Sequence, residues 1–293
     1  MDKELRILEL ADYYEKFIVE DAEGYLIINK KIKDYQCMFG FIKLPNNLET
    51  SKKIFSLIEE KAKKLGYKNI VGPVNYTTWM SYRWAINNYN LKLYPDCDNP
   101  GYYVDTIRSL GYKKLYTYRS VFIDMDNKLY DIGEAVYNQK IDEGFDFKLF
   151  CGEEVYDQVK DVYNISIDAF KGSYLYSEIP FEYFKQIYLE WTKKVKMVLY
   201  IAYRDNKAVG YVMGYMNPYS NDFISKTSAV LKEYQNRKVY VALLYLGVKY
   251  VKDLGLDKMI YHFQCEQKGT FQRFDENIES NEKNYAVFIK ELS

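Results

Sequence analysis

Two places in this sequence show the same change from helix to strand. An apolar stripe at helical spacing runs through residues 49–65, ends at Leu65-Gly66 and gives way at once to a predicted strand at 69–74. A second stripe runs through residues 239–254 and ends at Leu254-Gly255, just before a predicted strand at 258–265. Glycine commonly takes the left-handed conformation that closes a helix. Each place therefore predicts a β-helix-β unit with a short connection.

The two units lie about 190 residues apart, which favours an internal duplication over a short-period repeat. A chance repeat of the Leu-Gly ending is the alternative. The chain has 293 residues, enough for one large domain or two modest ones. The stretch 125–143 is polar and lacks strong periodicity. We therefore expect two tandem domains, at residues 1–130 and 144–293.

Apolar spacing and turn residues predict the remaining elements. In the first half they are a short helix at 4–17, strands at 24–30 and 35–43, the helix at 49–65 capped by Thr50 or Ser51, a helix at 102–110 and a strand at 116–124. In the second half they are a strand at 145–150, helices at 153–169 and 180–194, a strand pair at 197–204 and 208–217, a strand at 223–231 and a last strand at 285–290.

Composition narrows the classes of partner. Basic and acidic residues number 41 each, so the formal net charge is zero and nothing favours nucleic acid or an anionic membrane as a partner. No apolar stretch reaches the ~20 residues of a membrane span, and the charged N-terminus has no signal-peptide core. Four cysteines without a Cys-x-x-Cys pair, and one histidine, exclude a zinc site and fit a reducing compartment. We expect a soluble, cytoplasmic protein without a metal.

Tyrosine is unusually frequent, at 33 residues. Lysine, isoleucine and asparagine are also common, so a biased genome is one explanation. An aromatic-lined binding site is the other.

The second half resembles the GNAT superfamily of N-acyltransferases in its order of elements and in two segments. "NKAVGYVMGYMN" at 206–217 is similar to the family's central hairpin, where a Val-Gly pair starts the strand after a turn. "VLKEYQNRKVYVALLYLGVKYVKDLG" at 230–255 resembles the cofactor loop, usually Arg/Gln-x-x-Gly-x-Gly/Ala followed by a Leu-Leu helix. Gln235 stands at the Arg/Gln position, whereas Lys238 and Tyr240 replace the two glycines.

The first half looks like a more degenerate copy of the same fold. "GPVNYTTW" at 72–79 and "NPGYYVDTIRSLGYKK" at 99–114 resemble segments of a group of GNAT-like proteins. The resemblance implies an α+β fold of two tandem GNAT-like domains, each a mixed, largely antiparallel sheet flanked by helices.

In the family, the free N–H groups and the dipole at the start of the helix after this loop hold the pyrophosphate of acyl-CoA. Glycine lets the phosphate oxygens approach the backbone. Here Lys238 and Arg237 can compensate with positive charge, or Lys238 and Tyr240 can close the site, and both readings remain open. By resemblance, the acyl-CoA-binding residues are Val230, Leu231, Gln235, Asn236, Arg237, Lys238, Val239 and Tyr240.

Acyl transfer needs an acid and a base. Alternation along 258–266 places His262 and Glu266 on one face, and we take them as catalytic candidates, with a structural histidine as the alternative for His262. Cys265 falls on the opposite face, which predicts a core position.

In the fold, the connection between the first two helices of a copy borders the acceptor. That connection here is 168–184, so its aromatic residues either line an acceptor site or pack within a surface loop. Ser225 and Thr227, on the strand before the cofactor loop, either line the acyl site or are ordinary strand positions. The substrate candidates are Phe170, Tyr174, Tyr176, Ser225 and Thr227.

The resemblance implies an N-acyltransferase that moves an acyl group from acetyl-CoA or another acyl-CoA to the amine of a small molecule or peptide. One alternative is a GNAT-fold ligand-binding protein that has lost catalysis, which the missing glycines favour. Another is a Fem-type aminoacyl transferase, which takes its aminoacyl group from tRNA. An open splay between the strands beside the loop would favour the enzyme, and a Tyr240 ring in that notch would favour the binding protein.

Overall fold

The computed structural model describes residues 5–96, 98–125, 129–265 and 282–292. The elements of the N-terminal half are η1 (Leu5–Leu10), β1 (Tyr13–Val19), β2 (Ala22–Ile28), β3 (Cys37–Lys43), α1 (Leu48–Lys64), β4 (Asn69–Gly72), β5 (Trp84–Ala85), α2 (Gly101–Ser109) and β6 (Lys113–Asp124). Those that follow are α3 (Leu129–Asp142), β7 (Phe145–Cys151), α4 (Glu154–Asp157), α5 (Val159–Ala169), α6 (Phe181–Thr192), β8 (Met197–Arg204), β9 (Lys207–Met216), β10 (Phe223–Val230), η2 (Lys232–Tyr234), α7 (Val239–Asp253), β11 (Lys258–Cys265) and β12 (Glu282–Glu291).

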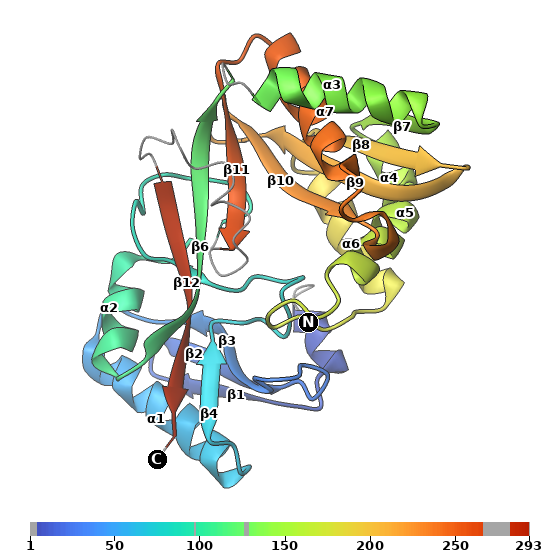
Figure 1. Ribbon diagram of the computed structural model, residues 1–293. Coiled ribbons are helices and arrows are strands. Elements are labelled where there is room, and N and C mark those ends of the chain that lie inside the picture. Colours follow the sequence, from blue (N-terminus) through green and yellow to red (C-terminus); the bar gives the residue numbers. More distant parts are fainter. Residues whose placement is uncertain (1–4, 97, 126–128, 266–281, 293) are drawn as a thin grey trace.

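The strands form one mixed sheet that runs through both halves. Its order is β1-β2-β3-β4-β12-β6-β11-β10-β9-β8-β7, with β5 paired to β12 beside this path. Figure 1 shows the N-terminal half below and the C-terminal half above, joined by the long strand β6. Most neighbours are antiparallel, while β3–β4 and β10–β11 are parallel. The expected α+β class, with a mixed sheet flanked by helices, is confirmed.

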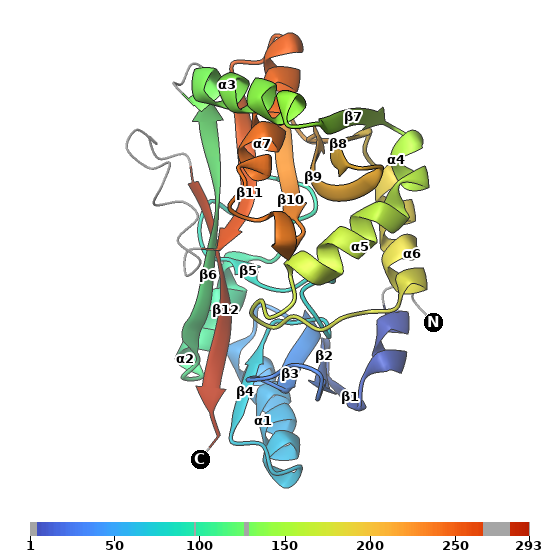
Figure 2. The ribbon, with the colours of Figure 1, turned by 45° about the vertical axis from the view of Figure 1, so that its right-hand side comes forward.

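The last strand belongs to the sheet of the first half. β12 lies between β4 and β6 and pairs antiparallel with both. It places the C-terminus beside α1, at the opposite end of the molecule from α3 (Figures 1 and 2). β6 in turn pairs with β11 through residues 118–124. Each half therefore contributes a strand to the other, and the boundaries at 1–130 and 144–293 stay a prediction.

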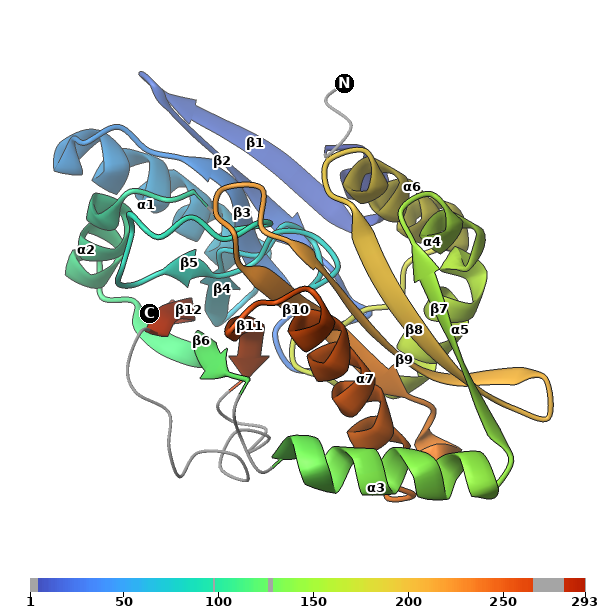
Figure 3. The ribbon, with the colours of Figure 1, turned by 90° about the horizontal axis from the view of Figure 1, so that it is seen from above.

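Helices cover both faces of the C-terminal part of the sheet. Successive residues of a strand point to opposite faces. On β9, the Tyr211 hydroxyl lies 2.8 Å from Ser166 Oγ of α5, whereas the Val212 side chain meets Gly247 of α7. α5 and α7 therefore lie on opposite faces, and α3 packs across α7 (Figure 3). Among the helices within the described ranges, none has the length and apolar character of a membrane span.

The Leu-Gly endings form as the sequence predicts. Gly66, Gly111 and Gly255 have φ of 87°, 87° and 73°, in the left-handed region. After Gly66, the Tyr67 N–H donates back to Ala62 C=O at 3.1 Å, which closes the helix end. The strand then begins at once, so the connection is as short as expected.

Three local predictions are wrong. Where a helix was expected at 4–17, the described residues from 5 onward hold the 3₁₀ helix η1 and then the strand β1, whose alternating exposure and pairing with β2 outweigh the helical spacing. Asn47 caps α1 in place of Thr50 or Ser51, because its Oδ1 accepts the N–H of Glu49 at 3.0 Å and of Thr50 at 3.2 Å. The polar stretch 125–143 contains α3, which is stabilised by packing on α7.

Candidate functional site

A cavity of ≈ 390 Å³ lies where the two halves meet. It is walled by the loop after β4, by β6, by the connection between α5 and α6, by α6, by α7, and by β9, β10 and β11. Of 24 lining residues 13 are aromatic, so the cavity is an aromatic-lined site of the kind that the tyrosine content allowed. The lining residues are Thr78, Trp79, Tyr82, Arg83, Tyr118, Phe170, Ser173, Tyr174, Tyr176, Phe184, Ile187, Tyr188, Trp191, Tyr211, Ser225, Lys226, Thr227, Ser228, Tyr240, Tyr261, His262, Phe263, Gln264 and Cys265.

The cavity is bordered by two strands that separate. β10 and β11 pair in parallel at three positions, the last of which joins Ser225 to Tyr261. Beyond it, β10 follows β9 as far as Val230, while β11 follows β6. Residues 226–228 of β10 and 262–265 of β11 consequently line the cavity from its two sides. This is the open splay that the acyltransferase interpretation requires, and we call it the wedge.

The loop between the wedge and α7 keeps a glycine-like backbone without glycine. Lys238, at the first glycine position, has a φ of 61°, and Asn236 has a φ of 64°. This conformation costs a side-chain-bearing residue about 1–2 kcal/mol. Lys238 C=O accepts the N–H groups of Val241 and Ala242, while the N–H groups of residues 236–240 have no backbone acceptor in the described part of the chain. Such free donors at the start of a helix form a site for an anion.

Other residues expected to bind the cofactor hold the loop in place. The Leu231 N–H donates to Val209 C=O at 2.9 Å, which continues the β10–β9 pairing by one residue. The Gln235 side-chain amide donates to Val230 C=O at 3.2 Å and so fixes the end of β10. Gln235 therefore shapes the loop. A role in cofactor binding for Val230, Leu231 and Gln235 stays a prediction.

The side chains at the start of α7 differ in where they lie. Those of Arg237 and Lys238 are exposed beside the free N–H groups. The Arg237 guanidinium lies 5.2 Å from the centre of the Tyr234 ring, which leaves its donors toward solvent. Val239 is buried in the core. Two positive charges thus stand next to the backbone donors, as compensation for the missing glycines requires.

Tyr240 enters the wedge from the helix side. It lines the cavity, with its hydroxyl next to Ser228 of β10, and burial raises the pKa of that hydroxyl. The ring also lies near Tyr261 of β11. The wedge is therefore open between its two strands but narrowed by the Tyr240 ring.

His262 lies deep in the site. It is 1% exposed, its ring stacks on Phe263 at 3.5 Å, and its Nδ1 lies 2.8 Å from Ser120 Oγ. Its Nε2 is buried, and no described residue offers it a hydrogen bond. Burial, followed by Arg83 and two lysines, holds the pKa of His262 well below its usual value, so the ring is neutral at pH 7. Glu266, the other catalytic candidate, lies outside the described residues.

Alternation fails along the end of β11. The pairing of β11 with β6 shifts register between Tyr261 and Gln264, and Phe263 has a φ of 59°. Residues 261–265 therefore all border the cavity, which a regular strand cannot achieve. For this reason Cys265 lines the cavity, and its expected core position is wrong.

The connection between α5 and α6 supplies the expected aromatic wall. Phe170 and Tyr176 meet the Trp79 ring edge-on, at 6.0 and 5.7 Å between centres. Tyr174 stacks on Tyr116 at 4.1 Å. All three predicted residues line the cavity, together with Trp79, which the sequence analysis did not single out.

This connection is fastened to the N-terminal half through Ser177. Ser177 Oγ accepts from the Asn29 side-chain amide at 2.9 Å. Ser177 C=O accepts from Thr77 Oγ1 at 3.2 Å and from Trp79 Nε1 at 3.0 Å. Asn29, Thr77 and Ser177 are buried, so the wall is a fixed part of the structure. Of the two readings of 168–184, the contacts favour the site wall.

A bulge in β10 brings a lysine into the same cavity. Ser225 and Thr227 both line it, as predicted, and the β10–β9 pairing skips the residue between them. Lys226 would face away in a regular strand, but the bulge turns it inward. Its Nζ lies 3.7 Å from the centre of the Trp191 ring and 3.3 Å from Thr227 Oγ1. Burial, followed by Arg83, lowers the pKa of Lys226 to about 7.

The N-terminal half contributes an arginine. Arg83 is 6% exposed, and its guanidinium carbon lies 3.4, 3.9 and 4.7 Å from the ring centres of Phe263, Tyr82 and Tyr118. Its φ is 77°, which is strained for a residue with a side chain. Arg83 follows the "GPVNYTTW" segment by four residues, and no periodicity distinguishes it in the sequence.

The family model described as "Acetyltransferase (GNAT) family" matches residues 159–270. Over this segment the chain is similar to the GNAT family. The matched range contains α5, α6, the wedge and α7. No curated protein matches the sequence.

One solved structure extends the likeness in fold over most of the chain. A tandem GNAT protein from the clavulanic acid biosynthesis pathway, solved without AcCoA, is similar at 8% identity and a TM-score of 0.52, over 93% of this chain and 79% of that one. That likeness shows a tandem GNAT-like fold. A GCN5-related N-acetyltransferase from Sphaerobacter thermophilus has 12% identity and a TM-score of 0.48, over 93% and 77% of the two chains. FemX has 10% identity and a TM-score of 0.41, over 100% and 91%. A TM-score of 0.41 neither supports nor opposes the Fem-type alternative.

Proposed function

We propose that the protein is an N-acyltransferase that moves an acyl group from an acyl-CoA to an amine held in the aromatic cavity. The wedge is the observation that carries this proposal. It opens between β10 and β11 after Ser225, and the loop that carries the free N–H groups of residues 236–240 follows β10 directly in the chain. An acyl thioester that enters from the α7 side would meet an amine bound in the cavity.

The loop residues fit the anionic part of such a substrate. The N–H groups of residues 236–240, the dipole of the 15-residue helix α7 and the exposed side chains of Arg237 and Lys238 all favour a pyrophosphate there. Lys238 keeps the backbone shape that glycine would give. Each charge-assisted hydrogen bond would contribute about 1.5–3 kcal/mol.

The reaction needs an uncharged amine and a protonated leaving group. The amine nitrogen attacks the thioester carbon, the carbon–sulfur bond breaks, the thiolate takes a proton, and the nitrogen loses one. Within the described residues, His262 is our candidate for the base. When its Nδ1–H donates to Ser120 Oγ, its Nε2 carries a lone pair without a partner. We assign His262 the role of the base that takes the proton from the amine nitrogen.

Binding and turnover test the proposal separately. Calorimetry with acetyl-CoA and with longer acyl-CoAs should show binding at submillimolar concentration. Release of free CoA in the presence of a panel of amines, followed with a thiol reagent, should then identify acceptors. No binding of any acyl-CoA at millimolar concentration would overturn the proposal.

Tyr240 favours a second candidate, a ligand-binding protein that no longer transfers acyl groups. Its ring lies in the wedge beside Ser228, where the thioester arm would pass. Tyr240→Gly separates the two candidates. If the ring turns aside during binding, the variant changes affinity for acetyl-CoA little. If the ring blocks the wedge, the variant gains affinity that the natural protein lacks.

A further inference from the structure

We infer that the cavity binds a carboxylate, held between Arg83 and Lys226, and that the acceptor is an amine with a carboxylate and an aromatic or apolar side chain. The carboxylate site stands on its own geometry. The amine part of the inference rests on the proposed acyl transfer.

The position of Arg83 in the cavity wall is energetically unfavourable. Its side chain is almost fully buried among three aromatic rings, its Nε has no hydrogen-bond partner among the described residues, and its backbone is strained. Tyr82 Oη accepts from its Nη1. In the described part of the chain, no carboxylate forms an ion pair with Arg83. Burying a charge without a counter-ion is unfavourable, and strain at such a residue is typical of a functional position.

Lys226 of β10 shows the same pattern. The bulge turns it into the cavity, where a Trp191 ring and the Thr227 hydroxyl are its neighbours. Again no carboxylate among the described residues pairs with it. Burial, followed by the nearby Arg83, lowers the pKa of Lys226 to about 7, which agrees with two cations that lie near each other in the cavity wall.

Two other buried lysines that the structure describes each pair with a carboxylate, unlike Lys226. Lys140 and Lys283, with side chains 5% and 3% exposed, pair with Glu143 and Asp96. The described lining of the cavity contains two cations, a neutral histidine and no carboxylate. A bound anion would supply the missing charge.

The chemistry of the walls narrows the class of anion. The guanidinium group of Arg83 offers planar paired donors that match a carboxylate. Thirteen aromatic residues around the remaining space suit an apolar or aromatic side chain. The volume of ≈ 390 Å³ lies at the small end of ligand sites, which fits one amino-acid-sized molecule.

Three probes that differ by one group each test the inference. L-phenylalanine has the carboxylate and the amine, 3-phenylpropionate has the carboxylate alone, and phenethylamine has the amine alone. Trp79 and Trp191 line the cavity, so tryptophan fluorescence reports binding and calorimetry confirms it. We expect both carboxylates to bind at least tenfold more tightly than phenethylamine, the effect of one lost charge-assisted hydrogen bond. Two results would overturn the inference. One is that phenethylamine binds as tightly as the two carboxylates. The other is that neither carboxylate binds at roughly 10 mM, near the weak limit of specific affinity.

Two variants locate the effect. Arg83→Gln and Lys226→Met should each weaken binding of 3-phenylpropionate by roughly tenfold or more. Lys249→Met, which removes an exposed lysine of α7 paired with Asp253, should not. Lys226→Met keeps the apolar stem, so it remains informative if Arg83→Gln fails to fold. Unchanged affinity in Lys226→Met would contradict the inference.

The same probes separate this inference from the proposed function. If L-phenylalanine binds in an Arg83-dependent way and is acylated by acetyl-CoA, both stand. If the carboxylates bind but no acyl-CoA supports transfer to any amine, the carboxylate site stands and acyl transfer fails. If amines without a carboxylate are acylated while neither carboxylate binds, the proposed function stands and the carboxylate site is wrong.

Discussion

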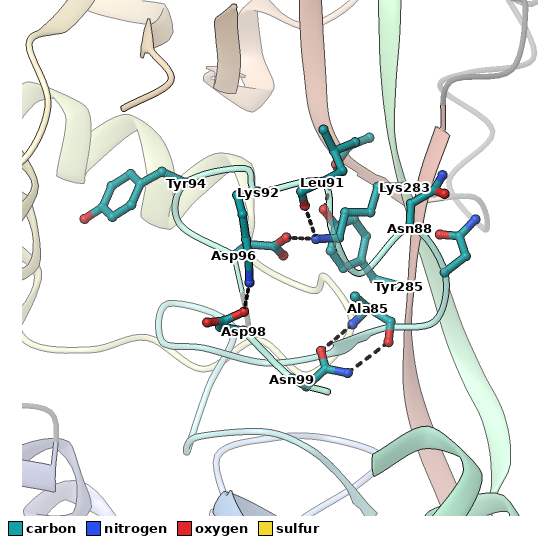
Figure 4. Close-up of polar contacts among 12 residues, drawn as sticks. Ala85, Asn88, Leu91, Lys92, Tyr94, Asp96, Asp98, Asn99, Lys283 and Tyr285 are labelled. Carbon is teal, nitrogen blue, oxygen red and sulfur yellow. Dashed lines mark hydrogen bonds and ion pairs between the residues drawn. The ribbon is translucent and has the colours of Figure 1, made fainter. Parts of the chain in front are cut away.

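The ion pair between Lys283 and Asp96 offers a sharp test of how the C-terminal strand is held. Lys283 of β12 donates to Asp96 and, at 2.6 Å, to Leu91 C=O in the loop before α2 (Figure 4). The two charged side chains are 3% and 8% exposed. Removing one partner of a buried ion pair typically costs 3–5 kcal/mol, because the other charge stays buried without compensation. We therefore expect Lys283→Met to lower the free energy of unfolding by about 3–5 kcal/mol.

The same loop contains a matched control. Lys92 pairs with Asp98, and their side chains are 47% and 81% exposed (Figure 4). Lys92→Met makes the same chemical change in a solvent-exposed pair, which is worth about 0–1 kcal/mol. Both variants should be compared with the natural protein by urea unfolding, followed by circular dichroism. The midpoint in urea should fall clearly for Lys283→Met and little for Lys92→Met.

A double variant checks the cause. Lys283→Met with Asp96→Leu removes both charges, so no carboxylate remains buried without its lysine. Replacing a buried pair by apolar residues is often neutral, and the double variant should regain most of the lost stability. If Lys283→Met unfolds within about 1 kcal/mol of Lys92→Met, burial of the pair does not carry the stability that we assign to it.

Three further outcomes follow from the structure. Since the pKa of Lys226 is about 7 and an anion favours its charged form, affinity for 3-phenylpropionate should fall by up to about tenfold per pH unit above pH 7, and the fall should disappear in Lys226→Met, because the His262 ring is already neutral at pH 7. Lys238→Val should be about 1–2 kcal/mol less stable than Lys238→Gly in thermal unfolding, because the left-handed backbone excludes a branched side chain; equal stability would contradict the strained φ. A fragment of residues 1–130 should stay unfolded alone and gain structure when a peptide of residues 279–293 is added, since β12 pairs with β4 and β6; a well-folded fragment would refute this dependence.

Sequence patterns gave the elements correctly where local interactions decide them. The helices that end in Leu-Gly at residues 65–66 and 254–255 form as predicted, because apolar spacing and a left-handed glycine act within one turn. β1 and α3 were missed because each is stabilised by a partner outside its own segment, β2 for the strand and α7 for the helix.

Part of the site was predictable from the strand positions in the sequence. Ser225 and Thr227 line the cavity as expected. Lys226 and Cys265 were missed because bulges break the alternation of β10 and β11, and bulges leave no periodic signal in a sequence. Arg83 comes from the other half of the chain, so its place in the site depends on how the halves meet.

The position of β12 affects how the chain can be made. A ribosome completes the N-terminal half long before it reaches residue 282, and until then β4 and β6 lack the strand that joins them. At about 5–20 residues per second, that interval lasts roughly 10–30 s. During it, two strands present unpaired backbone groups to any other chain, the condition that promotes aggregation. Synthesis in the cell therefore depends on keeping an unfinished sheet protected until its last strand is made.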